Sequence, residues 1–203
     1  ELKPNANCPN VDLSNQTLRD LDLQNSNFEG ANFEGSNLDG TDFTKANLTK
    51  ANFKKANLRH STLKQSNMFK ANLENANLAR ADLRHTNLKV VTAFNANFDG
   101  INGWALFGQG SKFDGATFHG ADLNFARMSG SSMKNCDFQA ANFEAAWMAN
   151  VNFEGSNFTN ANLQEVKLSN SSLSKANFTG TRIHFANLVD VFMENCIHCP
   201  VTW

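Results

Sequence analysis

Residues 27–58 read NFEGANFEGSNLDGTDFTKANLTKANFKKANL, and every fifth residue of this stretch is Phe or Leu. The residue before each of these apolar centres is Asn or Asp, and the residue two positions before it is small. The same frame extends from Leu13 to Met193. The centre is lost at Ala93, Gly103 and Gly108. A fixed internal period is typical of repeat architectures, so the repeat unit should determine the fold.

A period of five fits neither an α-helix nor a plain β-strand, whose periods are about 3.6 and 2. It fits a short strand followed by a corner. The centre and the small residue should point inward, the Asn or Asp between them should point outward, and the other two residues should turn the chain. Four corners close a square, so a coil should take about 20 residues and pair with its neighbours as parallel strands about 4.8 Å apart.

The pattern A-(D/N)-(L/F)-x-x resembles the signature of the pentapeptide repeat family, and the resemblance covers nearly the whole chain. It implies an all-β fold, a right-handed quadrilateral parallel β-helix built as a solenoid of 20-residue coils. The chain departs from the commonest form of the signature because Asn, rather than Asp, usually precedes the centre. The signature is specific for the fold and says little about function.

The sequence predicts one solenoid with different structure at its two ends. Residues 1–12 are expected to form an N-terminal cap, residues 13–193 the β-helix, and residues 194–203 a C-terminal cap, because a solenoid must hide its open strand edges. Residues 101–110 lose the centre twice and are rich in Gly. This composition predicts an irregular projecting loop.

One inward column of the second half is made of Phe alone. Its members are Phe98, Phe118, Phe138, Phe158 and Phe178. Rings at coil spacing should stack with an offset, which adds about 0.5–1.5 kcal/mol per pair beyond burial. His198 should close the end of this column, and Pro200 and Trp203 should cover the last coil.

The outward positions between Lys45 and Lys89 hold far more basic than acidic residues. The candidate anion-facing residues are Lys45, Arg59, His60, Lys64, Arg80, Arg84 and His85. Like charges stacked at coil spacing repel unless an anion lies over them, so a lipid headgroup, an acidic protein or nucleic acid could cover this patch. The alternative is a hydrated basic face without a ligand. Nucleic acid is disfavoured because exposed aromatic residues are scarce among these positions.

A second outward column places large residues where Asn is usual. The candidate partner surface consists of Trp104, Phe107, Arg127, Trp147 and Lys167. In this register Arg127 should lie between two aromatic rings in a cation–π arrangement. Exposed aromatic residues and Arg are typical of the energetically dominant positions of protein interfaces. The alternative is a structural ladder that satisfies itself.

Cys196 and Cys199 are close enough in sequence for a local disulfide, and two free thiols are the alternative. A metal site with His184 and His198 is disfavoured because no second Cys pair completes it. Cys136 occupies a small inward position, where a thiol serves as an apolar filler. The sequence contains no Gly-rich phosphate loop between a strand and a helix and no H-E-x-x-H motif, so we expect no enzyme activity, cofactor or metal.

The leading hypothesis is a non-enzymatic scaffold that presents flat faces to a protein or to an anionic surface. The alternative, implied by the family resemblance, is a DNA mimic that binds type II topoisomerases and protects them from quinolones. The formal net charge of −1 fits such a mimic poorly. A purely structural spacer is a further alternative. No apolar run reaches the roughly 18 residues of a membrane span. Cysteines near both ends and a first residue other than Met favour export to a periplasm or organelle lumen over the cytoplasm.

Overall fold

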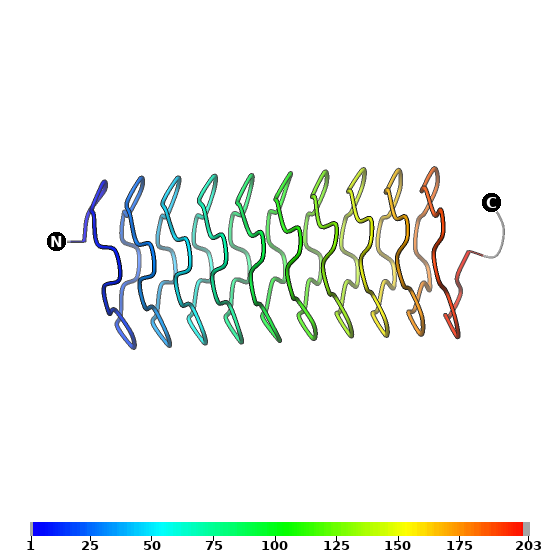
Figure 1. Ribbon diagram of the computed structural model, residues 1–203, viewed down its shortest axis with the longest axis horizontal. Helices are drawn as coiled ribbons and strands as arrows, with labels where there is room; N and C mark the ends of the chain where they lie inside the picture. Colours follow the sequence, from blue (N-terminus) through cyan, green and yellow to red (C-terminus); the bar gives the residue numbers. More distant parts are fainter. Residues whose placement is uncertain (1, 201–203) are drawn as a thin grey trace.

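In the computed structural model, which describes residues 2–200, the chain winds into a rod of stacked coils with its ends at opposite ends (Figure 1). From Asn7 to Ile197 each pentad contributes one isolated β-bridge residue, which a turn follows in nearly all pentads. The described part contains neither a helix nor a strand longer than one bridge residue. Every bridge is parallel and joins residue i to residue i+20, from Asn7↔Asn27 to Asn177↔Ile197. The coil therefore takes 20 residues, as the sequence predicts.

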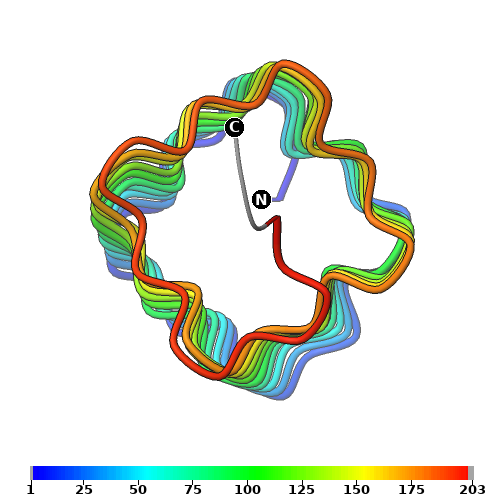
Figure 2. The same ribbon diagram turned by 90° about the vertical axis from the view of Figure 1, so that its right-hand side faces the viewer.

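The coils are square in cross-section, and Figure 2 shows their corners lying over one another along the rod. The fold is a right-handed quadrilateral β-helix. We number its four faces by their bridge residues, which recur every 20 residues: face 1 contains 7 to 187, face 2 contains 12 to 192, face 3 contains 17 to 197, and face 4 contains 22 to 182. Face 1 thus meets face 4 at turns such as 64–65 and 84–85, and face 3 meets face 4 at turns such as 59–60 and 79–80.

The corners share one backbone geometry regardless of their sequence. The second turn residue of every pentad from Asn5 to Asn195 has a positive φ. A backbone hydrogen bond closes the turn, as between the Ala31 N–H and the Phe28 carbonyl at 3.0 Å. Gly30 adopts this conformation with φ of 66°, but Arg80 also adopts it, with φ of 62°. The neighbouring coil stabilises this backbone conformation, because each turn also forms a backbone hydrogen bond with the turn one coil away, as between the Gly30 N–H and the Thr49 carbonyl.

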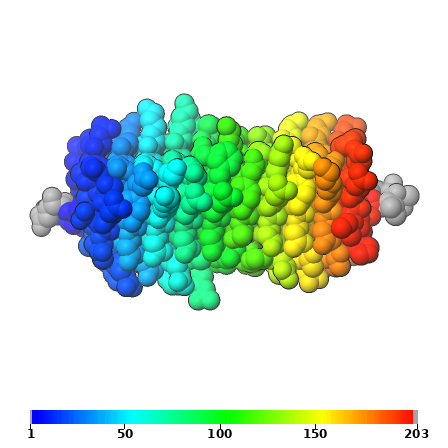
Figure 3. Space-filling model, turned by 90° about the horizontal axis from the view of Figure 1, so that it is seen from below, coloured from blue at the N-terminus to red at the C-terminus, as the bar shows by residue number. Residues whose placement is uncertain are grey.

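The apolar centres fill the bore of the rod, and the predicted Phe column is confirmed. Successive ring centroids from Phe98 to Phe178 lie 4.8, 5.1, 5.0 and 4.9 Å apart, with interplanar angles from 5° to 26°. This stacking follows from the bridges, which hold equivalent Cα atoms at coil spacing. The side chains close the rod along its whole length (Figure 3).

The loop predicted at residues 101–110 is not formed. Asn102 bridges Asp122 and Phe107 bridges Arg127, so the regular coil passes through this stretch. The reason is that a change in size at one inward position of the pentad compensates for the opposite change at the other inward position. A larger residue takes the small position wherever the centre is lost. The pairs are Val91 with Ala93, Ile101 with Gly103, and Leu106 with Gly108.

Leu106 fills the space that two missing centres leave. A Cβ atom on Gly103 would lie 2.7 Å from Leu106 Cδ2, and a Cβ atom on Gly108 would lie 3.6 Å from Leu106 Cδ1 and 2.6 Å from Met128 Sδ. Interiors pack to near-crystalline density, so a filled space needs no loop. The Gly residues therefore mark compensated core positions.

An N-terminal cap is predicted at residues 1–12, but the described residues 2–12 belong to the first coil. Asn7 bridges Asn27 and Asp12 bridges Asn32. Pro4 and Pro9 occupy the first turn position, where the fixed φ of Pro suits the corner. Proline therefore does not interrupt the repeat here.

The regular coil extends into the C-terminal cap predicted at residues 194–203, because Ile197 still bridges Asn177. Cys196 and Cys199 form a disulfide with Cα atoms 5.7 Å apart. His198 does not cover Phe178; it is exposed, with Nδ1 2.9 Å from Thr179 Oγ1. The predicted role of Trp203 falls outside the described residues. Within residues 2–200, no helix is long and apolar enough to cross a lipid bilayer.

Candidate functional site

Face 1 of the second half carries a ladder in which cations and aromatic rings alternate. The Arg127 guanidinium lies 5.7 Å from the ring centroids of both Phe107 and Trp147. Lys167 Nζ lies 4.2 Å from the Trp147 ring, and Lys89 Nζ lies 5.5 Å from the Phe107 ring. The predicted sandwich of Arg127 between two rings is confirmed, because the i to i+20 register stacks these side chains directly. Whether a partner binds there stays a prediction.

A second aromatic group lies along the adjacent corner, between faces 4 and 1. His85 packs edge-to-face against Trp104 at 4.9 Å between ring centroids, and Trp104 packs against Phe125 at 5.9 Å. Trp104, Phe125 and Trp147 remain 39%, 51% and 50% exposed. Its turn position predicts that Phe125 is exposed, but Phe125 was not among the residues predicted for the partner surface. Its signal is the 20-residue register, which places it one coil from the turn that carries Trp104.

The charges around face 1 are strongly unequal. We define the face 1 surface as the outward residues of face 1 and of its two flanking corners between residues 64 and 150. Its acidic residue is Glu144. Its Lys and Arg residues are Lys64, Lys70, Arg84, Lys89 and Arg127. The near-zero net charge of the chain therefore hides a basic, partly aromatic surface.

The predicted anion-facing patch is not one continuous surface. Its members fall on two corners separated by face 4, whose bridge column holds Asp42 and Asp82. The corner between faces 4 and 1 carries Lys45, Lys64, Arg84 and His85. The corner between faces 3 and 4 carries Arg59, His60 and Arg80. The 20-residue register predicts this division, because it places Arg59, His60 and Arg80 around the next corner from Lys64 and Arg84.

At each of these two corners, some of the basic residues already form ion pairs within the protein. Arg84 Nε donates to both oxygens of Asp82 at 2.9 and 3.1 Å, and its Nη2 lies 2.6 Å from Oδ2. Burial would raise the pKa of Asp82, but these hydrogen bonds and the charges of Arg84 and Lys64 hold it below its usual value. His60 Nδ1 lies 2.9 Å from Asp39 Oδ1, and this bond is the main cause of a lowered pKa of Asp39.

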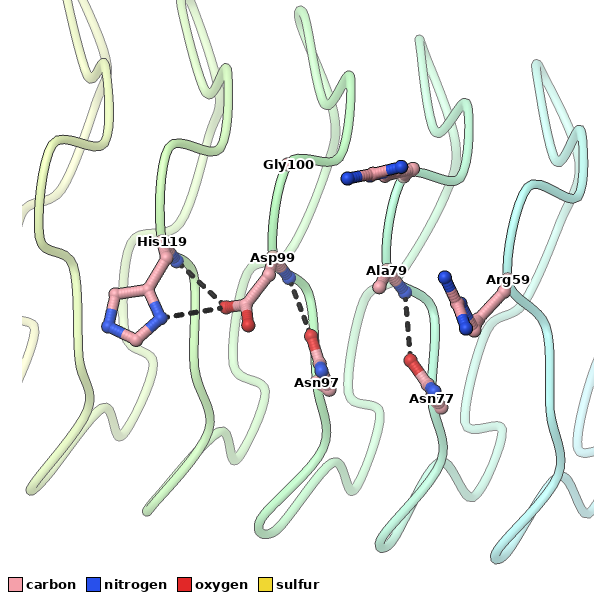
Figure 4. A pocket seen from close by; sticks show the side chains of 8 residues that line it. Arg59, Asn77, Ala79, Asn97, Asp99, Gly100 and His119 are labelled. Atoms are coloured by element: carbon pink, nitrogen blue, oxygen red, sulfur yellow. Dashed lines mark hydrogen bonds and ion pairs between the residues drawn. The ribbon is translucent and has the colours of Figure 1, made fainter.

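The corner between faces 3 and 4 also contains a groove of about 440 Å³, drawn in Figure 4. Its lining residues are Arg59, Asn77, Ala79, Arg80, Asn97, Asp99, Gly100 and His119. The hollow exists because Ala79 and Gly100 present almost no side chain at two successive corners. Among residues 2–200, neither Arg59 nor Arg80 has a carboxylate within ion-pair distance.

His119 lies at the other end of the groove and contacts the carboxylates of two acidic residues. Its Nε2 lies 2.8 Å from Asp137 Oδ2, its Nδ1 lies 3.5 Å from Asp99 Oδ1, and its backbone N–H donates to Asp99 Oδ1 at 2.9 Å. Burial would lower the pKa of His119, but hydrogen bonding and charge from Asp137, and then from Asp99, raise it. The sequence analysis did not single out His119, because its two partners are 18 and 20 residues away.

The described residues 2–200 contain no group of three or more His, Cys, Asp or Glu side chains that could hold a metal ion. Cys136 is buried, and burial raises the pKa of its thiol far above the usual range. Its Sγ lies 3.0 Å from the Phe113 carbonyl. This thiol is therefore a filler of the core rather than a nucleophile.

Comparison with known proteins agrees with the fold. A family profile described as pentapeptide repeats matches residues 5–35, 26–65, 66–102, 109–139, 136–174 and 156–195. No curated protein matches the chain significantly.

Solved structures of this architecture resemble the chain. HetL of the cyanobacterium Nostoc sp. strain PCC 7120, a pentapeptide repeat protein involved in heterocyst differentiation regulation, superposes with a TM-score of 0.51 at 20% identity, covering 91% of this chain and 87% of HetL. A pentapeptide repeat protein of the Arabidopsis thaliana thylakoid lumen gives 33% identity and a TM-score of 0.46, covering 50% of this chain and 68% of that one. QnrB1, a plasmid-mediated fluoroquinolone resistance protein, gives 16% identity and a TM-score of 0.41, with coverage of 90% and 89%.

Proposed function

The chain belongs to the pentapeptide repeat family, and from this premise we propose that it is a non-enzymatic scaffold that binds a protein partner through the face 1 surface. The inward side chains of the β-helix are buried in its core, so a partner can contact only the outward residues. The face 1 surface is the part of the rod where those residues depart most from the repeat.

One observation carries the proposal: the face 1 surface combines five Lys and Arg residues, one acid, and the exposed rings of Trp104, Phe125 and Trp147. Aromatic residues and Arg dominate interface energetics when a partner desolvates them. An excess of positive charge favours a negatively charged partner and speeds its association. The surface therefore suits an acidic protein segment that carries apolar side chains.

The same rings are poorly arranged for nucleic acid. Binding of single strands needs free aromatic faces on which bases can stack. The Trp147 ring already has Arg127 and Lys167 over it, at 5.7 and 4.2 Å from its centroid. The Trp104 ring contacts His85 and Phe125. We therefore favour a protein partner over nucleic acid.

The DNA-mimic alternative has less support from the charges. A mimic of duplex DNA must present a strongly acidic surface, whereas the face 1 surface is basic and the chain has a formal net charge of −1. A gyrase supercoiling assay with a quinolone tests this alternative directly. Protection of the enzyme by the protein would favour the mimic over the scaffold proposed here.

The test of the scaffold compares Arg127→Glu with Lys112→Glu. Both change an outward bridge residue to the opposite charge, but Lys112 lies on face 2. Binding to a labelled acidic peptide with interspersed Leu and Phe should weaken by roughly tenfold or more in the face 1 variant and little in the control. A matched peptide with Lys in place of its acids should not bind. Equal losses in the two variants, or tighter binding of single-stranded DNA than of the acidic peptide, would refute the proposal.

We also propose that the protein works in an oxidising compartment, such as a periplasm or an organelle lumen. The Cys196–Cys199 disulfide supports this, because disulfides are rare in reducing compartments. Protein isolated from its host under thiol-blocking conditions should gain two blocked thiols only after reduction. Blocking of all four cysteines on denaturation without reduction would contradict the proposal.

A further inference from the structure

The groove at the corner between faces 3 and 4 lies around a corner from the face 1 surface and is built differently. We propose that this groove is a binding site for a phosphate group, held between Arg59 and Arg80. Arg59 and Arg80 belong to the anion-facing patch that the sequence predicts, and the groove gives these two residues a defined site and a ligand class. This inference is independent of the protein partner proposed for face 1.

A missing carboxylate is the first support. Along this corner, Asp39 lies 3.1 Å from Arg19 and 2.9 Å from His60, and three coils further Asp99 contacts His119. Two residues lie between these acids in the same column, Arg59 next to Asp39 and Ala79 next to Asp99. Among the described residues, neither Arg59 nor Arg80 forms an ion pair, although the charge of Arg59 acts on Asp39 over a longer distance. An external anion would occupy the hollow that Ala79 and Gly100 leave.

Unused donors are the second support. Asn77 Oδ1 accepts from the Ala79 N–H at 3.1 Å, and Asn97 Oδ1 accepts from the Asp99 N–H at 2.8 Å, as Figure 4 shows. These bonds fix the orientation of both amides. Among the described residues, neither Nδ2 group donates to a protein acceptor, whereas the equivalent Asn57 Nδ2 donates to Asn37 at 3.0 Å. The groove thus gathers two guanidinium groups and two oriented amides that have hydrogen-bond donors to spare.

The acid in the groove is already engaged. Asp99 Oδ1 accepts the His119 N–H at 2.9 Å and lies 3.5 Å from the imidazole Nδ1. A protonated His119, which also contacts Asp137 at 2.8 Å, offsets part of the charge of Asp99. The positive charges of Arg59 and Arg80 are therefore left for a ligand, and their sum matches a phosphate dianion.

The number of donors favours phosphate over carboxylate. A guanidinium presents a planar fork that fits either group. Two guanidinium groups and two amides together offer more donors than the two oxygens of a carboxylate can use well, whereas a phosphate monoester exposes three acceptor oxygens. The groove is open to solvent on one side, so the esterified end of the ligand can extend away from the rod.

The experiment titrates the full chain with inorganic phosphate, O-phosphoserine and acetate by calorimetry. We expect saturable binding of both phosphates and weaker binding of acetate. Binding of inorganic phosphate alone would assign a free-ion ligand, and binding of both would assign a monoester. Arg59→Gln and Arg80→Gln should each lower the affinity by roughly 10- to 100-fold. Arg182→Gln, which removes an exposed arginine of face 4, should leave it unchanged.

A further variant separates loss of the site from loss of the fold. Ala79→Asp places a carboxylate where the corner lacks one, so it should abolish phosphate binding while the melting temperature stays the same or rises. No saturable phosphate binding by the wild type, equal binding of acetate, or full binding by Ala79→Asp would overturn the inference. Failure of the face 1 peptide assay would not, because Arg127→Glu leaves this groove intact.

Discussion

The two halves of face 1 share a backbone and differ in what they display. The first half carries an Asn ladder in which Asn27 donates to Asn7 at 2.8 Å and Asn47 donates to Asn27 at 3.0 Å. The second half replaces this ladder by alternating rings and cations from residue 107 to residue 167. The backbone does not register the change: the Phe28 N–H to Asn47 carbonyl and the Met128 N–H to Trp147 carbonyl distances are both 2.8 Å.

The contrast shows that the outward bridge residue is free to change. The coil is held by bonds between backbone groups of neighbouring turns and by the packing of the centres. An outward side chain adds local bonds but determines neither the register nor the corner. A binding surface can therefore be placed on this face at little cost in stability, which is how repeat proteins carry different recognition surfaces on one architecture.

The largest expected effect comes from removing a centre. Phe138→Ala removes a fully buried ring that stacks on Phe118 and Phe158, so the free energy of unfolding should fall by about 3–5 kcal/mol. Trp147→Ala, on the outside of the opposite face, should cost about 1 kcal/mol. Urea unfolding of both variants measures the difference. Similar losses would mean that the outward ladder supports the fold as much as the core does.

A smaller loss of stability should come from residues 101–108, where a large residue at the small position compensates for a missing apolar centre. Leu106→Ala removes the side chain that fills the space beside Gly103 and Gly108, and should cost about 2–4 kcal/mol. In the wild type, Gly108→Ala should destabilise, because its Cβ would lie 2.6 Å from Met128 Sδ.

The two changes should couple, since each alters the same space. In the Leu106→Ala background, Gly108→Ala should cost less than in the wild type, or stabilise. A double-mutant cycle of unfolding free energies measures this coupling. Strict additivity would show that Leu106 does not compensate for the missing centre at Gly108.

Extending the Asn ladder into the second half should change stability still less. The double variant Arg127→Asn and Trp147→Asn converts two coils to the pattern of the first half. We expect the free energy of unfolding to change by about 1 kcal/mol or less, while binding of the acidic peptide is lost. The reverse change, Asn47→Arg, is the matched control for stability. A large loss of stability in the double variant would indicate a structural role for the cation–π ladder.

The smallest effect concerns pH at the corner between faces 3 and 4. His119, which Asp99 and Asp137 contact, has a raised pKa and so stays protonated to a higher pH than a free imidazole. As pH rises through that pKa, His119 loses its charge and Asp99 is left to oppose an anion bound between Arg59 and Arg80. Sulfate binding should then weaken a few-fold, since a single screened charge near the surface changes.

Sulfate is the suitable probe because its own charge is constant in this range, whereas the second ionisation of phosphate falls near pH 6. Titration by calorimetry from pH 5 to pH 9 measures the dependence. His119→Gln should weaken this dependence, because the imidazole whose charge changes over this pH range is then absent. A wild-type affinity for sulfate that does not vary with pH would show that the charges of His119 and Asp99 do not affect anion binding in the groove.

Much of this architecture could be read from the sequence, because the repeat is local and strict. The period of five predicted the corner, the 20-residue coil and the bridges. From the coil length followed the stack of Phe98 to Phe178 and the position of Arg127 between two rings. The family resemblance supplied the hand of the helix. These features depend on spacing alone, so a correct period places every inward column.

The errors share a cause. The loop at residues 101–110 and the cap at residues 1–12 were inferred from residue types that usually interrupt regular structure, Gly and Pro. In this fold Gly103 sits beside the filling side chain of Leu106, and Pro9 sits where a turn needs a fixed φ. Composition identifies a disturbance of the pattern, but the neighbouring coil decides whether the disturbance is absorbed.

By itself, the sequence determined that this chain is a square β-helix and which residues face outward, because a five-residue period permits few other solutions. Only the tertiary structure decided which outward charges are free. Arg84 is neutralised by Asp82, His60 by Asp39, and Arg59 and Arg80 are left around a hollow. The reason is physical: the strength of a charge on the surface depends on the partners within a few ångströms, and those partners come from neighbouring columns and coils.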